Sequence, residues 1–284
     1  MIEMITIAMK QAIANALAED IGLGDVTSLA TIAPDTRLEG HFLAKAEGVV
    51  AGLAVVGDVF AQVDPQIAFQ PLVADGAYIA KGDIVARVNG RGPGILTAER
   101  TALNLLQRMS GTATLTRRYV LAVTGTRCII LDTRKTVPGL RAFDKLAVVL
   151  GGGANHRFGL FDMVLIKDNH IEAAGGISAA VRMVRESTRC AGLSIEVEVT
   201  SLAQLAEALS LQVQRIMLDN MNLDTMRQAV ELTAGRVPLE ASGGITLETV
   251  ADIAATGVDY ISVGALTHSV HALDISLEVT LVKE

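Results

Sequence analysis

IEVEVTSLAQLAEALSLQVQRIMLD (residues 195–219) is the stretch of this chain that decides its fold. It contains two short aliphatic runs, 195–199 and 215–219, separated by residues 201–209 with apolar positions at helical spacing. A strand, a helix of this length and a second strand form a βαβ unit, in which the two strands run parallel in one sheet. The segment therefore predicts a parallel sheet covered by helices.

The same alternation of strands and helices continues on both sides of this segment. It leaves room for a further short strand near 151–158. Because a closed barrel of this kind has eight strands, the pattern predicts an incomplete, open α/β barrel of six to seven parallel strands. The clear strands are expected at 127–131, 163–166, 194–199, 215–218, 237–241 and 259–263, and the helices at 140–150, 176–190, 201–209, 223–234 and 246–256.

The first part of the chain has a different pattern. Residues 4–18 have apolar positions at helical spacing, which predicts an amphipathic helix. Residues 38–89 form short alternating runs broken by Gly and Pro, which are typical of strands and hairpins, so we expect a first domain of about 90 residues, mostly β. A helix is predicted over 97–110, ended by Ser-Gly-Thr and followed by a second helix over 113–123.

The composition narrows the class of protein. Hydrophobic residues make up 50% of the 284 residues, but aromatic residues only 3%, so the core is built from aliphatic side chains, as in buried parallel strands. The few aromatic residues and a net charge of −7 disfavour nucleic-acid binding. No apolar run reaches the length of a membrane span, no basic segment precedes an apolar one at the N-terminus, and two cysteines are too few for a disulfide framework. We therefore expect a cytoplasmic protein without a membrane partner.

Positive charge is concentrated in one part of this acidic chain. Residues 97–170 contain eleven Lys or Arg and five Asp or Glu. The cations lie in LDTRKT (131–136), GGGANHR (151–157) and LIKDNH (165–170), at turns and at the ends of apolar runs. A small polyanionic ligand explains this cluster better than the alternative, a solvated basic face, because surface charges usually scatter along helices.

Polar or small residues end most of the predicted strands. The carboxyl ends of barrel strands meet at one rim, where active sites are built, so these residues are expected around a single mouth. SGGI (242–245) and VGAL (263–266) follow the last two strands, and their glycines allow main-chain N–H groups to approach a phosphate. The strand-end residues are Asp132, Lys167, Glu198, Asp219, Glu240, Ser242 and Gly264.

Two of these carboxylates, Glu198 and Asp219, end neighbouring strands. Beside a phosphate site they suit Mg²⁺, which shares oxygen ligands with substrate phosphates, and they could equally stabilise a developing positive charge on a sugar. Glu196 has the same parity as Glu198 and faces the same side. His170 is expected to make a local hydrogen bond. A substrate with carboxylates would be surrounded by Arg134, Lys135, His156, Arg157 and Lys167.

Several longer strings, in this order, resemble the quinolinate phosphoribosyltransferase family over nearly the whole chain. That resemblance implies an N-terminal α/β sandwich domain over 1–111 and an open-barrel catalytic domain over 112–284, with the C-terminal tail returning to the first domain. It also implies a homodimer in which the N-terminal domain of one subunit covers the barrel mouth of the other. The strings are EDIGLGDVT, ERTALNLLQRMSGTAT, LDTRKTVPGLR, GGGANHRFGL, DMVLIKDNH, IEVEV, IMLDNM, LEASGGI and TGVDYISVGALTHS.

The resemblance also implies roles for single residues. Arg100 matches an arginine that reaches across the dimer interface, and Lys135, Lys167, Glu198 and Asp219 are the expected catalytic residues. Arg134, His156, Arg157 and Lys167 match the quinolinate-binding set, with Thr133 and Lys135 as neighbouring contacts. Glu198 and Asp219 match residues near the ribose and Mg²⁺, and Ser242, Gly243, Gly244, Val263, Gly264 and Ala265 match the phosphate-binding loops.

The implied reaction is attack by the ring nitrogen of quinolinate on C1 of phosphoribosyl pyrophosphate (PRPP), followed by loss of CO₂. Val148, Val149 and Leu150 depart from the family pattern, which often has a polar residue or Cys at this place. The alternatives are a paralogue of the molybdenum-associated type acting on another acid, and a non-catalytic ligand-binding barrel.

Overall fold

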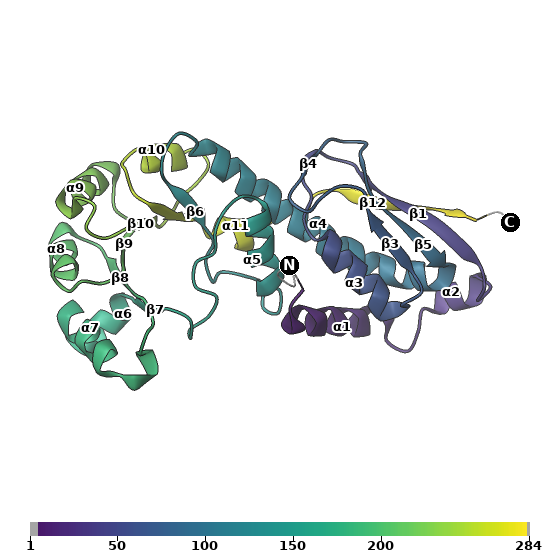
Figure 1. Ribbon diagram of the computed structural model, residues 1–284, viewed down its shortest axis with the longest axis horizontal. Coiled ribbons are helices and arrows are strands. Elements are labelled where there is room, and N and C mark those ends of the chain that lie inside the picture. The colour runs from purple at the N-terminus through teal and green to yellow at the C-terminus, as the bar shows by residue number, and fades with distance from the viewer. Residues whose placement is uncertain (1–4, 283–284) are drawn as a thin grey trace. The chain divides into compact units, whose positions relative to one another are not determined.

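A computed structural model describes residues 5–282 of the chain, which divide into two compact units (Figure 1). The first unit contains the chain up to Arg117, Thr136–Gly152 and the chain from Thr267 onward, and the second contains Arg118–Lys135 and Gly153–Leu266. Both units are therefore assembled from separate segments of the chain. The single division expected between residues 111 and 112 remains a prediction about the domains.

The first unit is built on an antiparallel sheet of four strands in the order β12-β1-β5-β3. The C-terminal strand pairs with β1, from Ala44 opposite Ile275 to Leu38 opposite Leu281. The sheet strands are β1 (Arg37–Ala44), β3 (Ala68–Pro71), β5 (Ile84–Arg91) and β12 (Ile275–Leu281), and β2 (Gly48–Val49) pairs with β4 (Tyr78–Ile79).

The helices of the first unit cover a core in which Phe42 and Phe60 meet edge to face, with ring centroids 6.2 Å apart. Helix α3 was not predicted, because its sequence LAVVGDVFAQV, with three valines and a glycine, resembles a strand. The first domain is consequently less β-rich than expected. The helices are α1 (Ile7–Ile21), α2 (Val26–Thr31), α3 (Leu53–Val63), most of α4 (Gly92–Ala122) and α5 (Arg141–Leu150). The first residue of the helix predicted over 4–18 lies outside the described residues.

Helix α4 corrects the prediction of two helices separated at residues 110–112, because it continues without a break from Gly92 to Ala122. The small residues at 110–112 allow close packing instead. The hydroxyl of Ser110 accepts a hydrogen bond from the main-chain N–H of Ala51 at 3.0 Å, and Gly111 lies against the main chain of His271 and Ala272, where a side chain would clash. Tertiary contact, not helix termination, therefore explains this Ser-Gly-Thr string.

The second unit confirms the predicted open barrel. Its six strands pair in the order β6-β11-β10-β9-β8-β7, all parallel, and within residues 5–282 no pairing joins β6 to β7. Figure 1 shows α7 to α10 on the outer side of these strands. The strands are β6 (Ile129–Leu131), β7 (Val164–Ile166), β8 (Ile195–Val199), β9 (Arg215–Asp219), β10 (Leu239–Ser242) and β11 (Tyr260–Ser262). The helices are α6 (Asp168–Ala174), α7 (Ile177–Glu186), α8 (Leu202–Ser210), α9 (Leu223–Thr233) and α10 (Val250–Ala254), with the 3₁₀ turn η1 (Thr188–Cys190) before β8 and the short α11 (Ala265–His268) at the border of the units.

The seventh strand for which the sequence left room is reduced to a single bridge between Leu131 and Ala154. Residues 155–163 then run on without regular structure to β7. The gap in the barrel is thus filled by the loop that carries His156 and Arg157.

Candidate active site

A cavity of about 650 Å³ lies at the carboxyl ends of the strands in the second unit. Its walls come from the segments that follow β6 to β10, as expected for a barrel with its site at this rim. The predicted residues that line it are Thr133, Arg134, Lys135, His156, Arg157, Lys167, Glu198, Asp219, Ser242, Gly243 and Gly244.

Four predicted residues are not in this lining. Val263 is 1% exposed and its main-chain N–H donates to the carbonyl of Leu131, so this amide is already bonded within the sheet. Gly264 and Ala265 follow it and are half-buried. Arg100 is exposed on α4 in the first unit. The roles expected for these four residues remain predictions.

The basic wall of the cavity contains two arginines that repel each other. Burial lowers the pKa of the Arg157 guanidinium, and the charge of Arg134 lowers it further. The Nε atom of Arg134 is buried and has no hydrogen-bond partner among the described residues. An unpartnered buried N–H next to a second guanidinium is costly, and an anion bonded to both would remove that cost.

The acidic wall begins with Glu198, which is 9% exposed. Its Oε2 lies 3.2 Å from the Nζ of Lys167, so the two walls meet in this ion pair. On the next strand, Asp219 Oδ2 accepts a hydrogen bond from the side-chain amide of Asn220 at 2.8 Å. The other oxygen of each carboxylate has no hydrogen-bond partner in the described part of the chain.

The loop after β10 combines Ser242 with two glycines of positive φ. Gly243 has φ 102° and Gly244 has φ 60°, conformations that favour glycine. A Cβ on Gly243 would lie 2.6 Å from Cγ of Asn220, whose own φ is 53° and whose N–H donates to the carbonyl of Ser242. Only glycine fits at 243, which leaves the main chain of this loop open to a ligand.

His156 lies at the bottom of the cavity, 8% exposed, with both ring nitrogens engaged. Its Nδ1 accepts a hydrogen bond from the main-chain N–H of Arg157 at 2.8 Å, so the ring proton is on Nε2, 2.9 Å from Oε2 of Glu196. The ring is a neutral imidazole. The positive charge expected at this position is therefore absent, and the cations of the cavity are the Arg and Lys residues.

Below the cavity, the inward-facing residues of the strands are charged instead of aliphatic. Glu240 Oε2 lies 2.9 Å from Nη1 of Arg215, and its Oε1 accepts a hydrogen bond from the hydroxyl of Ser262. Burial raises the pKa of Glu240 to about 7, and the neighbouring Glu196 acts in the same direction. Burial likewise raises the pKa of Glu196.

His156, Glu196 and Glu240 lie close enough to suggest a metal site, since their ligand atoms are within 4.8 Å of one another. The histidine argues against one. A metal on Nε2 would require this nitrogen to lose its proton while Nδ1 still accepts from the Arg157 N–H, which would leave an anionic ring. The cluster is better described as a hydrogen-bonded network.

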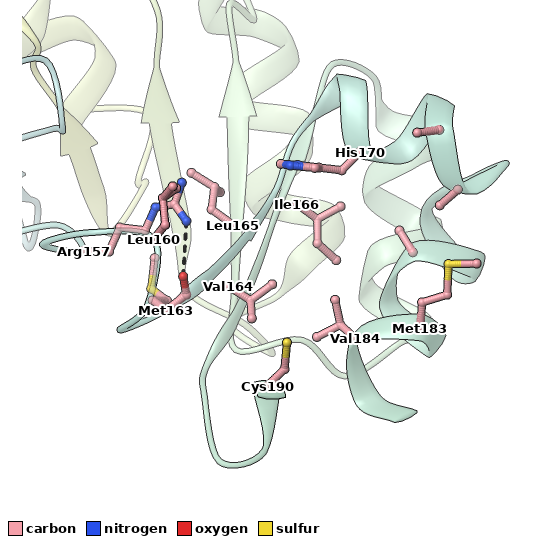
Figure 2. Close-up of a pocket in the computed structure, with 13 residues that line it drawn as sticks. Arg157, Leu160, Met163, Val164, Leu165, Ile166, His170, Met183, Val184 and Cys190 are labelled. Carbon is pink, nitrogen blue, oxygen red and sulfur yellow. Dashed lines mark hydrogen bonds between the residues drawn. The ribbon is translucent and has the colours of Figure 1, made fainter. Parts of the chain in front are cut away.

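A second cavity, of about 490 Å³, borders β7 and is mainly apolar. Figure 2 shows its lining, with Arg157 bonded to the carbonyl of Met163 on one side and Met183 and Val184 on the other. It shares Arg157 and Leu165 with the first cavity. Its lining offers few polar groups, so a charged substrate fits the first cavity.

The sequence analysis missed five residues of the first lining. Asp168 and Asn220 directly follow predicted residues, and Ser262 has the parity of an inward-facing strand residue, so spacing alone could have found them. The prediction of a local bond for His170 is confirmed, because its Nδ1 accepts from the main-chain N–H of Lys167 at 3.0 Å. The missed residues are Leu165, Asp168, Met217, Asn220 and Ser262.

An open barrel whose strand ends carry two arginines, two lysines, two carboxylates and a glycine loop defines an enzyme site for a multiply anionic substrate. Comparison with known proteins identifies the family. Models of the N-terminal and C-terminal domains of quinolinate phosphoribosyl transferase match residues 25–110 and 112–278, and the chain belongs to this family.

Individual relatives agree over almost the full length. The chain is 49% identical over 292 residues to the chloroplastic nicotinate-nucleotide pyrophosphorylase (carboxylating) of Arabidopsis thaliana, covering 96% of this chain and 83% of that protein. It is 44% identical to a probable enzyme of the same name from Bacillus subtilis, covering 97% and 95%. The crystal structure of NadC from Streptococcus pyogenes superposes with a TM-score of 0.93 at 40% identity, covering 97% of each chain.

Proposed function

We propose that this chain transfers the phosphoribosyl group of PRPP to quinolinate with loss of CO₂, forming nicotinate mononucleotide and pyrophosphate. The observation that carries the proposal is the buried, unpartnered Nε of Arg134 beside Arg157, in a cavity that also contains carboxylates and a glycine loop. A planar dicarboxylate satisfies the two guanidinium groups. The family relationship supports the same reaction.

Each wall has a separate task in this reaction. Arg134, Arg157 and Lys135 bind the two carboxylates of quinolinate, and Ser242 and the Gly243–Gly244 main chain bind the 5′-phosphate of PRPP. The ring nitrogen attacks C1 of the ribose as the bond from C1 to pyrophosphate breaks. Positive charge develops on the sugar in this step, and the Glu198 carboxylate stabilises it.

Decarboxylation follows from the charge on the product ring. The quaternary ring nitrogen withdraws electrons, so the bond to the neighbouring carboxylate breaks, its electron pair stays on the ring carbon and CO₂ leaves. That carbon then takes up a proton. The protein contributes by holding the dicarboxylate in a confined, basic cavity throughout both steps.

Mg²⁺ is the proposed cofactor. Glu198 and Asp219 fit it, because each has a carboxylate oxygen without a hydrogen-bond partner among residues 5–282 and both line the cavity with the glycine loop. Hard oxygen donors shared with phosphate groups are the usual surroundings of Mg²⁺. When bound, the ion would neutralise the charge of the leaving pyrophosphate.

We also propose that the enzyme is a homodimer in which Arg100 of one subunit completes the cavity of the other. Support comes from exposed apolar side chains in the same unit as Arg100, since Leu23, Val26 and Leu29 lie largely in solvent in the isolated chain. A second subunit would remove this surface from water.

No helix within residues 5–282 has the length and apolar character needed to cross a membrane. We propose a cytoplasmic location, in keeping with the two free cysteines, Cys128 and Cys190.

The test is to incubate the purified chain with quinolinate, PRPP and Mg²⁺ and to measure nicotinate mononucleotide and CO₂. Formation of both products in equal amounts is the expected result. Binding of quinolinate without turnover would refute the catalytic proposal and favour a ligand-binding role. Turnover of a different acid in preference to quinolinate would refute the proposed substrate.

A further inference from the structure

The inference concerns how the dicarboxylate pocket is held in shape, and it rests on the proposed function. Arg134 and Arg157 repel each other, yet both line the same cavity. Two like charges keep this arrangement only if the protein fixes them. The contacts of Arg157 show where that fixing comes from.

Arg157 is held at two points. Its Nη1 donates to the carbonyl of Met163 at 3.2 Å, the bond drawn as a dashed line in Figure 2. Its main-chain N–H donates to Nδ1 of His156 at 2.8 Å. The position of the Arg157 main chain is therefore tied to the orientation of the histidine ring.

The histidine ring is fixed from below. Its Nε2–H donates to Glu196 at 2.9 Å, and Glu240 Oε1 lies 3.6 Å from the same nitrogen. The main-chain N–H of His156 donates to the carboxylate of Asp132 at 2.8 Å. Glu196 is on β8, in which all five residues are buried, so the acceptor belongs to a rigid part of the barrel.

We propose that Glu196 is a positioning residue for the dicarboxylate: through the Nε2–H of His156 it holds the 156–157 main chain so that the Arg157 guanidinium stays beside Arg134. Glu196 does not line the cavity and acts only through the histidine. Such a fixed pair of arginines lowers the ordering cost of binding a planar dicarboxylate. A burial of two carboxylates and an arginine under the site, which is costly in itself, then has a function.

Replacing Glu196 separates this role from a general structural one. Glu196→Leu removes the acceptor, so the KM for quinolinate should rise about tenfold or more, with smaller changes in kcat and in the KM for PRPP. Glu196→Gln keeps a side-chain oxygen that can accept from Nε2–H, so it should restore most of the quinolinate affinity. Nitrogen NMR of the His156 ring should show the proton on Nε2 in the wild type and in Glu196→Gln.

A second variant covers the case in which Glu196→Leu fails to fold. In His156→Asn the side-chain oxygen can accept from the Arg157 N–H but cannot reach Glu196, so it should show the same selective rise in the KM for quinolinate. If both single variants fold, their effects should not add in the double variant, because they break one contact chain.

The proposal is overturned if folded Glu196→Leu, or His156→Asn, keeps a quinolinate KM within about twofold of the wild type. It is also overturned if Glu196→Gln is as defective as Glu196→Leu. Quinolinate binding, measured by calorimetry without PRPP, keeps this test separate from the proposed function. A wild-type chain that binds quinolinate but forms no product would refute the reaction and leave the positioning role open to the same comparison.

Discussion

Replacing Gly243 by alanine should remove the activity proposed here by distorting the loop after β10. At φ 102° an alanine is strained by about 2 kcal/mol. Its Cβ would also lie 2.6 Å from Cγ of Asn220, where carbon atoms normally stay about 3.5 Å or more apart, so Asn220 would have to move by about 1 Å.

That movement would affect both substrate walls. Asn220 donates to Asp219 through its side chain and to the carbonyl of Ser242 through its main chain, so it cannot shift without disturbing an acid and the glycine loop together. A displacement of about 1 Å in a binding group can lower the rate about 100-fold, and we expect a loss of this size in kcat/KM for PRPP. The KM for quinolinate should change much less.

The assay is steady-state turnover with PRPP varied at saturating quinolinate, together with urea unfolding. Gly235→Ala is the matched control, because Gly235 has φ 72°, no atom lies within 4 Å of its added Cβ, and it follows α9 outside the cavity lining. It should lose stability without losing activity. A Gly243→Ala enzyme within about twofold of the wild type in kcat/KM for PRPP would refute the reasoning.

Lys135→Ala and Arg100→Ala should each lose most activity while remaining folded by circular dichroism, and near wild-type rates in both would refute the site assignment. Removing divalent cations with a chelator should abolish turnover, and Mg²⁺ should restore it; turnover that persists in excess chelator would contradict the proposed cofactor. Because burial raises the pKa of Glu240 to about 7 from 4.5, the folded chain retains a proton that the unfolded chain has lost, and the free energy of unfolding falls as pH rises through this range. Relative to the wild type, Glu240→Gln should therefore gain about 3 kcal/mol between about pH 5 and pH 8 in urea unfolding, and a constant difference would contradict the burial effect.

The strands of the second unit were predictable because each is a short aliphatic run with turn signals on both sides. In β8 and β9 the alternation IEVEV and RIMLD also showed which side chains face inward. The order of the strands and the opening between β6 and β7 follow from their number and parallel direction. For the same reason the strand-end residues could be placed at one rim.

The errors have physical causes that one sequence does not reveal. The Ser-Gly-Thr string at 110–112 reads as a helix end, yet its residues are small because the main chain of residues 51 and 271 passes close by. His156 follows a glycine-rich loop and precedes an arginine, which suggests a charged ligand, but its tautomer depends on Glu196, forty residues further along the chain. Long-range contacts decided both cases.

The charged interior under the cavity has a practical consequence for anyone who wishes to make this protein more heat-resistant. Aliphatic substitutes of matching volume for Glu240 and Arg215 are the obvious choice, since buried ion pairs often stabilise less than well-packed hydrocarbon. The same substitutions would loosen the support on which the substrate arginines rest. Thermal tolerance and affinity for the acid substrate should therefore be exchanged against each other at these positions, and directed evolution toward robustness should leave them unchanged.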